Sequence, residues 1–179
     1  MNDGLIPNRY AKALFKLSQE RGDTSQVYNE MKHLDVAYAA EPGLKKAVNN
    51  PFLPVADKLK LLCAASRAKL DSTAAQFMEL VIKNNRIDFL RAIALSFMKQ
   101  YRELNGIAKV EVVTATKLGD DEINAIVDVV KEQLGGKTIE LTKSVNPDLI
   151  GGFTVDVDSR VLDASVKSQL EKLRLRLAQ

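Results

Sequence analysis

The most motif-like residues of this sequence lie in its last third. Gly151 and Gly152 are adjacent, and glycine pairs occur in loops whose backbone wraps around phosphate. The Gly-x-x-x-x-Gly-Lys-Ser/Thr and Gly-x-Gly-x-x-Gly spacings of such loops are missing here. A bulge or a tight entry into a strand is therefore favoured over a phosphate site.

Two nearby carboxylates could bind a divalent cation. Asp156 and Asp158 alternate along a predicted strand, so they share one face of that strand. No loop with the spacing of an EF-hand supplies further oxygen ligands. Solvent-facing carboxylates on an antiparallel strand are far commoner, and we predict no metal site.

Groups for nucleophilic or acid-base catalysis are scarce. His33 is the single histidine and Cys63 the single cysteine, so an internal disulfide is excluded and a zinc site is disfavoured. His33 lies at the edge of an apolar helical stripe, and the favoured interpretation is a surface histidine. Cys63 lies on a predicted amphipathic helix, and the favoured interpretation is a small buried hydrophobic residue. We predict no catalytic residue and no cofactor. The alternative is a small enzyme that uses Asp156, Asp158 and His33 and loses its activity when they are replaced by alanine.

Basic residues gather on the last predicted helix, where they could grip nucleic acid or an anionic membrane: Lys167, Lys172, Arg174 and Arg176. Glu171 interrupts this run, and cations near a helix C-terminus are favoured by the helix dipole alone. The 179 residues include 26 basic and 23 acidic side chains, a formal net charge of +3. Nucleic-acid binders concentrate positive charge on one face, so we predict a solvated helix face and no nucleic-acid partner.

The elements that position these residues change character near the middle of the chain. From Pro7 to Leu104 the apolar residues recur at helical spacing, interrupted by glycine, proline and asparagine. After Gly106 the period changes to two, which predicts a strand. A helix, further strands near 137–143 and 153–157, and a last helix capped by Asp163 follow. One face of that last helix carries four apolar residues, Val166, Leu170, Leu173 and Leu177.

These patterns predict an α+β protein with two domains. Residues 1–105 are expected to form a six-helix bundle, and residues 106–179 a small α+β domain. No apolar stretch approaches the roughly 20 residues that cross a bilayer, and the N-terminus lacks the features of a signal peptide. The sequence thus predicts a protein of the cytoplasm.

Several segments, taken in order, resemble the δ subunit family of F-type ATP synthases, which includes the mitochondrial oligomycin-sensitivity-conferring protein. They are RYAKALF at 9–15, KNNRI at 83–87, PDLIGGF at 147–153 and VLDASV at 161–166. The resemblance covers essentially the whole chain. The absence of a transit peptide indicates a bacterial member.

This resemblance implies a function without catalysis. The protein is expected to link the α/β catalytic head of a proton- or sodium-translocating ATP synthase to the b subunits of its peripheral stalk. It would then be a peripheral membrane protein at the cytoplasmic face of the cell membrane. The C-terminal domain is expected to bind the C-terminal ends of the b subunits, and the last helix and the Gly151-Gly152 region are the candidate contacts.

The resemblance also implies that the N-terminal helix of an α subunit docks between the first and fifth helices. The residues expected to bind it come from both helices: Tyr10, Ala13, Leu14, Leu17, Phe77, Leu80, Val81 and Asn84. Ala13 is the most informative, because a small side chain lets a partner helix approach closely. Some of the others could instead pack the bundle, and for Leu14 and Leu17 both roles stay open.

Overall fold

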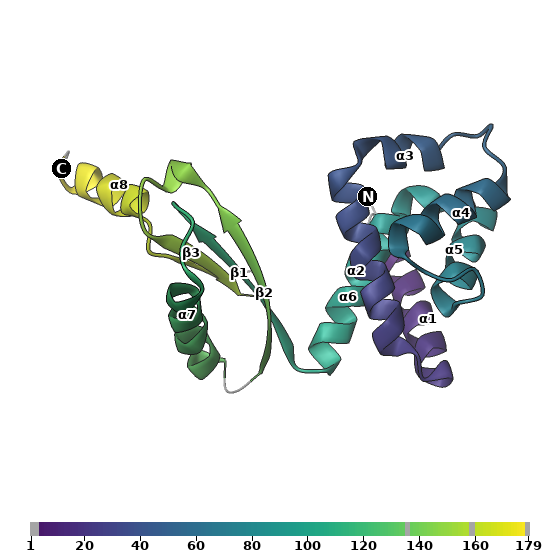
Figure 1. Cartoon of the computed structure of the whole chain (residues 1–179), viewed down its shortest axis with the longest axis horizontal. Helices are drawn as coiled ribbons and strands as arrows, with labels where there is room; N and C mark the ends of the chain where they lie inside the picture. Colours follow the sequence, from purple (N-terminus) through teal and green to yellow (C-terminus); the bar gives the residue numbers. More distant parts are fainter. Residues whose placement is uncertain (1–3, 135–136, 158–159, 178–179) are drawn as a thin grey trace. The chain divides into compact units, whose positions relative to one another are not determined.

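The computed structural model of the chain describes residues 4–134, 137–157 and 160–177 (Figure 1). The chain divides into two compact units, Met1–Tyr101 and Arg102–Gln179, called here the helical unit and the sheet unit. The division falls inside a helix, whereas the sequence places the boundary after residue 105. Helices and a four-stranded sheet confirm the predicted α+β class. No helix of the described ranges is long and apolar enough to cross a membrane.

The described part of the helical unit is built from α-helices and one short 3-10 helix. Their bounds are α1 Leu5–Arg21, α2 Thr24–Ala40, α3 Pro42–Val48, α4 Val55–Ser66, α5 Thr73–Lys83, η1 Ile87–Phe89 and α6 Leu90–Leu104, the last of which continues into the sheet unit. Gly22 ends α1 in the left-handed conformation. The Ser72 hydroxyl caps α5 by accepting from the Ala75 N–H at 3.2 Å.

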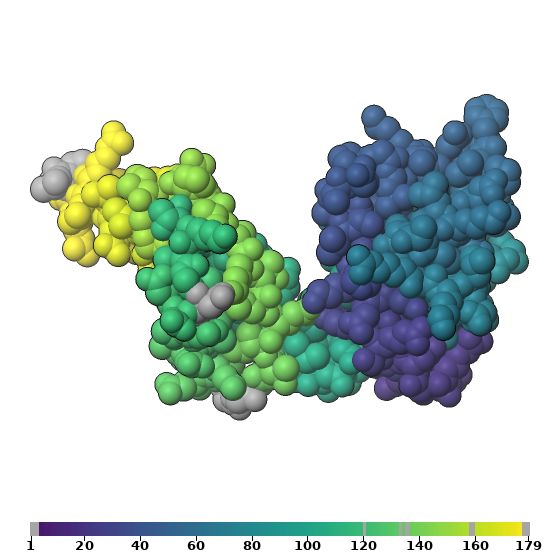
Figure 2. Space-filling model, viewed as in Figure 1, coloured from purple at the N-terminus to yellow at the C-terminus, as the bar shows by residue number. Residues whose placement is uncertain are grey.

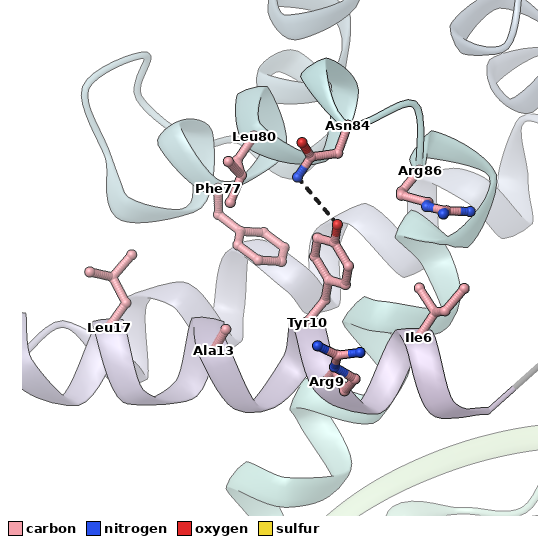
Figure 3. Close-up of a pocket in the computed structure, with 9 residues that line it drawn as sticks. All are labelled: Ile6, Arg9, Tyr10, Ala13, Leu17, Phe77, Leu80, Asn84 and Arg86. Carbon is pink, nitrogen blue, oxygen red and sulfur yellow. Dashed lines mark hydrogen bonds between the residues drawn. The ribbon is translucent and has the colours of Figure 1, made fainter.

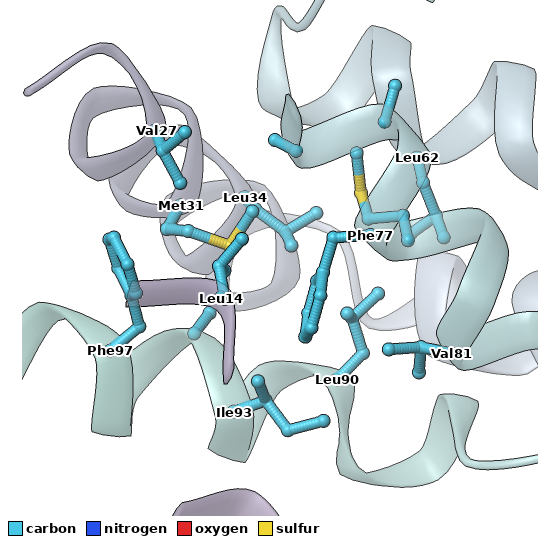
Figure 4. Packing of buried hydrophobic residues seen from close by; sticks show 14 of the residues in the cluster. Leu14, Val27, Met31, Leu34, Leu62, Phe77, Val81, Leu90, Ile93 and Phe97 are labelled. Atoms are coloured by element: carbon cyan, nitrogen blue, oxygen red, sulfur yellow. The ribbon is translucent and has the colours of Figure 1, made fainter. Parts of the chain in front are cut away.

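A continuous apolar core holds these helices together (Figure 4). Leu14 of α1, Met31 of α2 and Phe97 of α6 are fully buried in it. The Phe15 ring packs on that of Phe97 with centroids 5.9 Å apart. Burial of each such side chain stabilises the fold by roughly 1.5–3 kcal/mol.

Besides the end of α6, the described part of the sheet unit contains two α-helices, one 3-10 helix and four strands. Its elements are β1 Ile107–Thr114, α7 Asp120–Gln133, β2 Thr138–Val145, the 3-10 helix η2 Pro147–Leu149, β3 Phe153–Val157, β4 Arg160–Asp163 and α8 Val166–Leu177. The strand order is β2-β1-β3-β4. β1 pairs with β2 in parallel, across the connection through α7, and with β3 antiparallel. Val110, Val112 and Val155 meet Val130 of α7 in a small core.

The start of α8 corrects one prediction. Asp163 does not cap the helix; its carboxylate accepts from the Ser165 N–H at 2.8 Å. The Ser165 hydroxyl accepts from the Ser168 N–H at 3.2 Å and so takes the capping position. Asp163 and Ser165 lie two positions apart and are both common capping residues, so the sequence pattern alone did not distinguish them. The predicted stop at Gly135-Gly136 lies outside the described residues.

The glycine pair lies directly before β3, at a tight entry into this strand, which is one of the two interpretations that the sequence favoured. Gly152 has φ +75°, and a Cβ there would collide with the Ala164 carbonyl oxygen. A Cβ on Gly151 would lie 2.9 Å from Val166 Cγ2. The Val166 N–H also donates to the Gly151 carbonyl at 3.0 Å, which ties β3 to the start of α8. Side chains at this pair would therefore disrupt the sheet unit.

Replacing Gly152 by alanine is predicted to destabilise the sheet unit by more than about 2 kcal/mol, because of the positive φ and the collision. Gly119→Ala is the matched control, since Gly119 has φ −68° and a Cβ there would lie 3.8 Å from its nearest neighbour. The control should cost less than about 1 kcal/mol. Urea unfolding followed by the amide NMR signals of β1 and β3 measures both, and equal losses would contradict this assignment.

Candidate partner-binding groove

A groove of about 510 Å³ runs between α1 and α5 (Figure 3). Side chains from α1, α5 and the turn after α5 line it: Ile6, Arg9, Tyr10, Ala13, Leu17, Phe77, Leu80, Asn84 and Arg86. Residues 6, 10, 13 and 17 are spaced by three or four, so they follow one stripe of α1. Residues 77, 80 and 84 follow a matching stripe of α5. Two helices of ordinary periodicity thus build most of the groove.

The floor of the groove is apolar and its geometry is fixed by one aromatic pair. The rings of Tyr10 and Phe77 meet edge to face, with centroids 6.3 Å apart and an interplanar angle of 70°. The Asn84 side-chain N–H donates to the Tyr10 hydroxyl at 3.2 Å, which links α1 to the end of α5 (Figure 3). Leu80 is 50% exposed although it is apolar. The groove therefore offers uncovered apolar surface on a rigid support.

The charge of the groove has one sign. Arg9 and Arg86 line it, and its described lining contains no acidic residue. Both arginines lie toward the Ile6 end, away from Leu17 (Figure 3). An apolar ligand with a carboxylate near that end matches this distribution best. No nucleophile with an adjacent base lines the groove, so the arrangement suits binding.

The structure separates the eight sequence-predicted residues into two groups. Tyr10, Ala13, Leu17, Phe77, Leu80 and Asn84 line the groove. Leu14 and Val81 are fully buried in the core (Figure 4). This burial favours the packing role that was left open for Leu14, and it corrects the prediction that Val81 faces a partner. Each is next in sequence to a groove residue, and one step of about 100° around a helix turns the side chain inward.

Sequence reasoning missed Ile6, Arg9 and Arg86. Ile6 continues the stripe of α1 by one turn, so the same spacing rule finds it once the helix start is known. Arg86 follows Asn85, whose φ of 52° turns the chain back toward α1. Asn84-Asn85 marks the end of the helix in the sequence, but only the tertiary structure places Arg86 at the groove.

The other candidate residues are not arranged for catalysis. Cys63 is buried, as predicted, and this burial raises the pKa of its thiol, which disfavours the thiolate. His33 lies on α2 beside a different hollow. Within the described ranges, no group of three or more His, Cys, Asp or Glu residues could hold a metal ion. Asp156 pairs with Glu111 across the strands, and Asp158 lies outside the described residues.

A second uncovered apolar surface lies on the sheet unit. Leu170 and Leu173 of α8 are 51% and 52% exposed. Val166 lies one turn before Leu170 on the same face of α8 and is 37% exposed. We call Val166, Leu170 and Leu173 the α8 surface; Figure 2 shows α8 in yellow. The side chain of Leu177 is outside the described part. An apolar stripe without a cover is typical of an interface.

The chain is similar to known proteins over nearly its whole length. The family model described as ATP synthase delta (OSCP) subunit matches residues 6–177. ATP synthase subunit delta of Parabacteroides distasonis is 36% identical over 177 residues, which covers 99% of this chain and 98% of that protein. ATP synthase subunit delta of Prochlorococcus marinus (strain AS9601) is 34% identical over 173 residues, which covers 97% of this chain and 96% of that protein.

Solved structures with the same fold include the following example. It is a chain in the cryo-EM structure of the Toxoplasma gondii mitochondrial ATP synthase hexamer, with a TM-score of 0.75 and 22% sequence identity. The match covers 97% of both chains.

The burial of the groove residues predicts different roles for two neighbours on α5. Phe77 is 4% exposed, so Phe77→Ala should cost about 3–5 kcal/mol of unfolding free energy. Leu80→Ala removes a half-exposed side chain and should cost less than about 1 kcal/mol. Urea unfolding monitored by helical circular dichroism tests both variants. A loss for Leu80→Ala as large as that for Phe77→Ala would mean that Leu80 belongs to the core.

Proposed function

This chain belongs to the ATP synthase delta (OSCP) subunit family, and on that premise we propose that it joins the catalytic head to the peripheral stalk through two surfaces, one on each unit. Members of this family are non-catalytic components of the peripheral stalk in F-type ATP synthase, a membrane-associated complex for ATP synthesis and ion transport. The protein is therefore a structural subunit. We place it at the cytoplasmic face of the cell membrane.

We propose that the six helices of residues 1–105 form the head-binding domain. Its groove receives the N-terminal helix of an α subunit. The observation that carries this proposal is the groove itself, where apolar stripes of α1 and α5 stay uncovered around the small, exposed Ala13. An amphipathic helix can lay its apolar face into such a slot. Arg9 and Arg86 favour an acidic residue on that helix at the Ile6 end of the groove.

We propose that residues 106–179 form the stalk-binding domain, and that the α8 surface receives the C-terminal ends of the b subunits. Leu170 and Leu173 are half-exposed on α8, next to basic residues such as Lys172 and Arg174. An amphipathic helix with an acidic flank would cover these leucines and pair with the cations. Because the two surfaces lie on separate units, each attachment can be broken without the other.

The head contact is tested with a peptide that spans the N-terminal helix of the α subunit. Ala13→Trp should fill the groove and weaken binding of the peptide by roughly tenfold or more, about 1.4 kcal/mol per factor of ten. Ala56→Trp, at an exposed position of α4, is the matched control and should bind like the wild type. Fluorescence anisotropy with labelled peptide measures all three chains. The groove is not the binding site if the wild type does not bind micromolar peptide, or if Ala13→Trp leaves the affinity unchanged.

The stalk contact is tested by a charge on the α8 surface. Leu170→Asp should abolish binding of a soluble C-terminal b segment, because a carboxylate would be buried against apolar side chains. It should leave the affinity of the α-subunit peptide unchanged. Val36→Asp, at an apolar position of α2 that is also exposed, is the control. If the Leu170→Asp variant still retains the b segment in a pull-down experiment, the stalk-binding surface is not the α8 surface.

A further inference from the structure

The turn that joins α6 to β1 contains the one Asn-Gly pair of the chain, Asn105-Gly106. These two residues lie between the end of α6 at Leu104 and the start of β1. Both belong to a turn, and Asn105 is exposed. The turn lies close to the division between the two units, which falls after Tyr101. Neither the groove nor the α8 surface includes it, so its chemistry is separate from the proposed contacts.

An asparagine side chain can react with the main chain of the residue that follows it. The amide nitrogen of the next residue attacks the side-chain carbonyl carbon, a five-membered succinimide ring forms, and the side-chain nitrogen leaves as ammonia. Water then adds to one of the two ring carbonyls and opens the ring. Opening on one side gives aspartate, and opening on the other gives isoaspartate, in which the main chain runs through the former side chain. The net reaction turns an amide and water into a carboxylate and ammonium, with no oxidation or reduction.

The following residue, Gly106, favours this attack because it has no side chain. It has φ +62°, and a Cβ built on it would meet nothing within 4 Å, so the space around its Cα is open. A larger residue would hinder the approach of the Asn105 carbonyl carbon to the nitrogen. The turn also lacks the repeated hydrogen bonds that fix the dihedral angles of helices and strands. The reacting groups are therefore accessible to each other and to water.

Other asparagines of the chain lack one or more of these features. Asn50 and Asn146 precede proline, whose nitrogen has no hydrogen to lose and cannot attack. Asn29 lies within α2 and Asn124 within α7, where helical geometry directs the side chain back toward the helix N-terminus and away from the next nitrogen. Asn84 ends a helix, as Asn105 does, but the residue after it carries a side chain.

We propose that Asn105 is a site of spontaneous deamidation, which converts the turn between α6 and β1 into aspartate and isoaspartate forms as the protein ages. Each product adds a negative charge to the turn. Isoaspartate also inserts a methylene group into the main chain. α6 and the start of β1, where Ile107 pairs with Thr138, hold the two ends of the turn. The turn itself must therefore absorb the added length.

The test ages the folded, full-length chain at mildly alkaline pH and physiological temperature, and follows each asparagine by peptide mapping with mass spectrometry. The mass change from amide to acid is expected at Asn105 before any other asparagine. A purified protein-isoaspartate methyltransferase then labels the isoaspartate with methyl groups. Asn105→Gln keeps the amide but requires a less favourable six-membered ring, so it should lose most of the methyl label. Asn29→Gln, at an exposed position of α2, is the matched control and should age like the wild type.

The same samples show the structural consequence. Amide NMR signals of residues 102–109 should split as the modified fraction grows, whereas those of α4 should not change. The proposal is overturned if Asn105 keeps its amide in the folded chain but loses it in an unfolded control, because the folded turn would then block the attack. It is also overturned if another asparagine reacts first, or if Asn105→Gln takes up as much methyl label as Asn29→Gln.

Discussion

α1 and α5 divide their apolar side chains between the core of the helical unit and the groove, and the rest of this unit depends on that division. Leu14 and Val81 are buried in the core, while Ala13 and Leu80 stay outside. Phe77 serves both, since it is buried and yet forms part of the groove floor with Tyr10. A helix with a wide apolar stripe can bury one half of that stripe in the core and leave the other half exposed in a groove. The groove, which is the proposed partner surface, is thus supported directly by the core beneath it.

Apolar surfaces that remain exposed on a rigid core suit a protein that acts by binding its neighbours. Its described residues hold uncovered apolar surfaces on two compact units, one on α1 and α5 and one on α8. A stator subunit resists rotation by binding both neighbours tightly, and nanomolar affinity corresponds to about −12 kcal/mol. A few well-buried aliphatic and aromatic anchors can supply energies of this order. The proposed linkage therefore depends on complementary shape and charge.

Much of this structure could be predicted from periodicity. The 3.6-residue spacing before Gly106 and the alternation after it gave the α+β class. Six of the eight expected groove residues line the groove: Tyr10, Ala13, Leu17, Phe77, Leu80 and Asn84. Periodicity could not show that Leu14 is buried and Leu17 lines the groove, because both residues belong to one wide apolar stripe in the sequence. It also could not place Arg86 at the groove, since that position is defined by a contact between distant segments.

Hydrogen exchange with the full-length chain tests the central claim most directly. Amide exchange is compared with and without a peptide that spans the N-terminal helix of the α subunit. If the stripes of α1 and α5 form the head-binding surface, the peptide should slow exchange in residues 6–17 and 77–86 and leave α8 unchanged. Protection that falls on α8, or a bound peptide that protects neither α1 nor α5, would contradict the account.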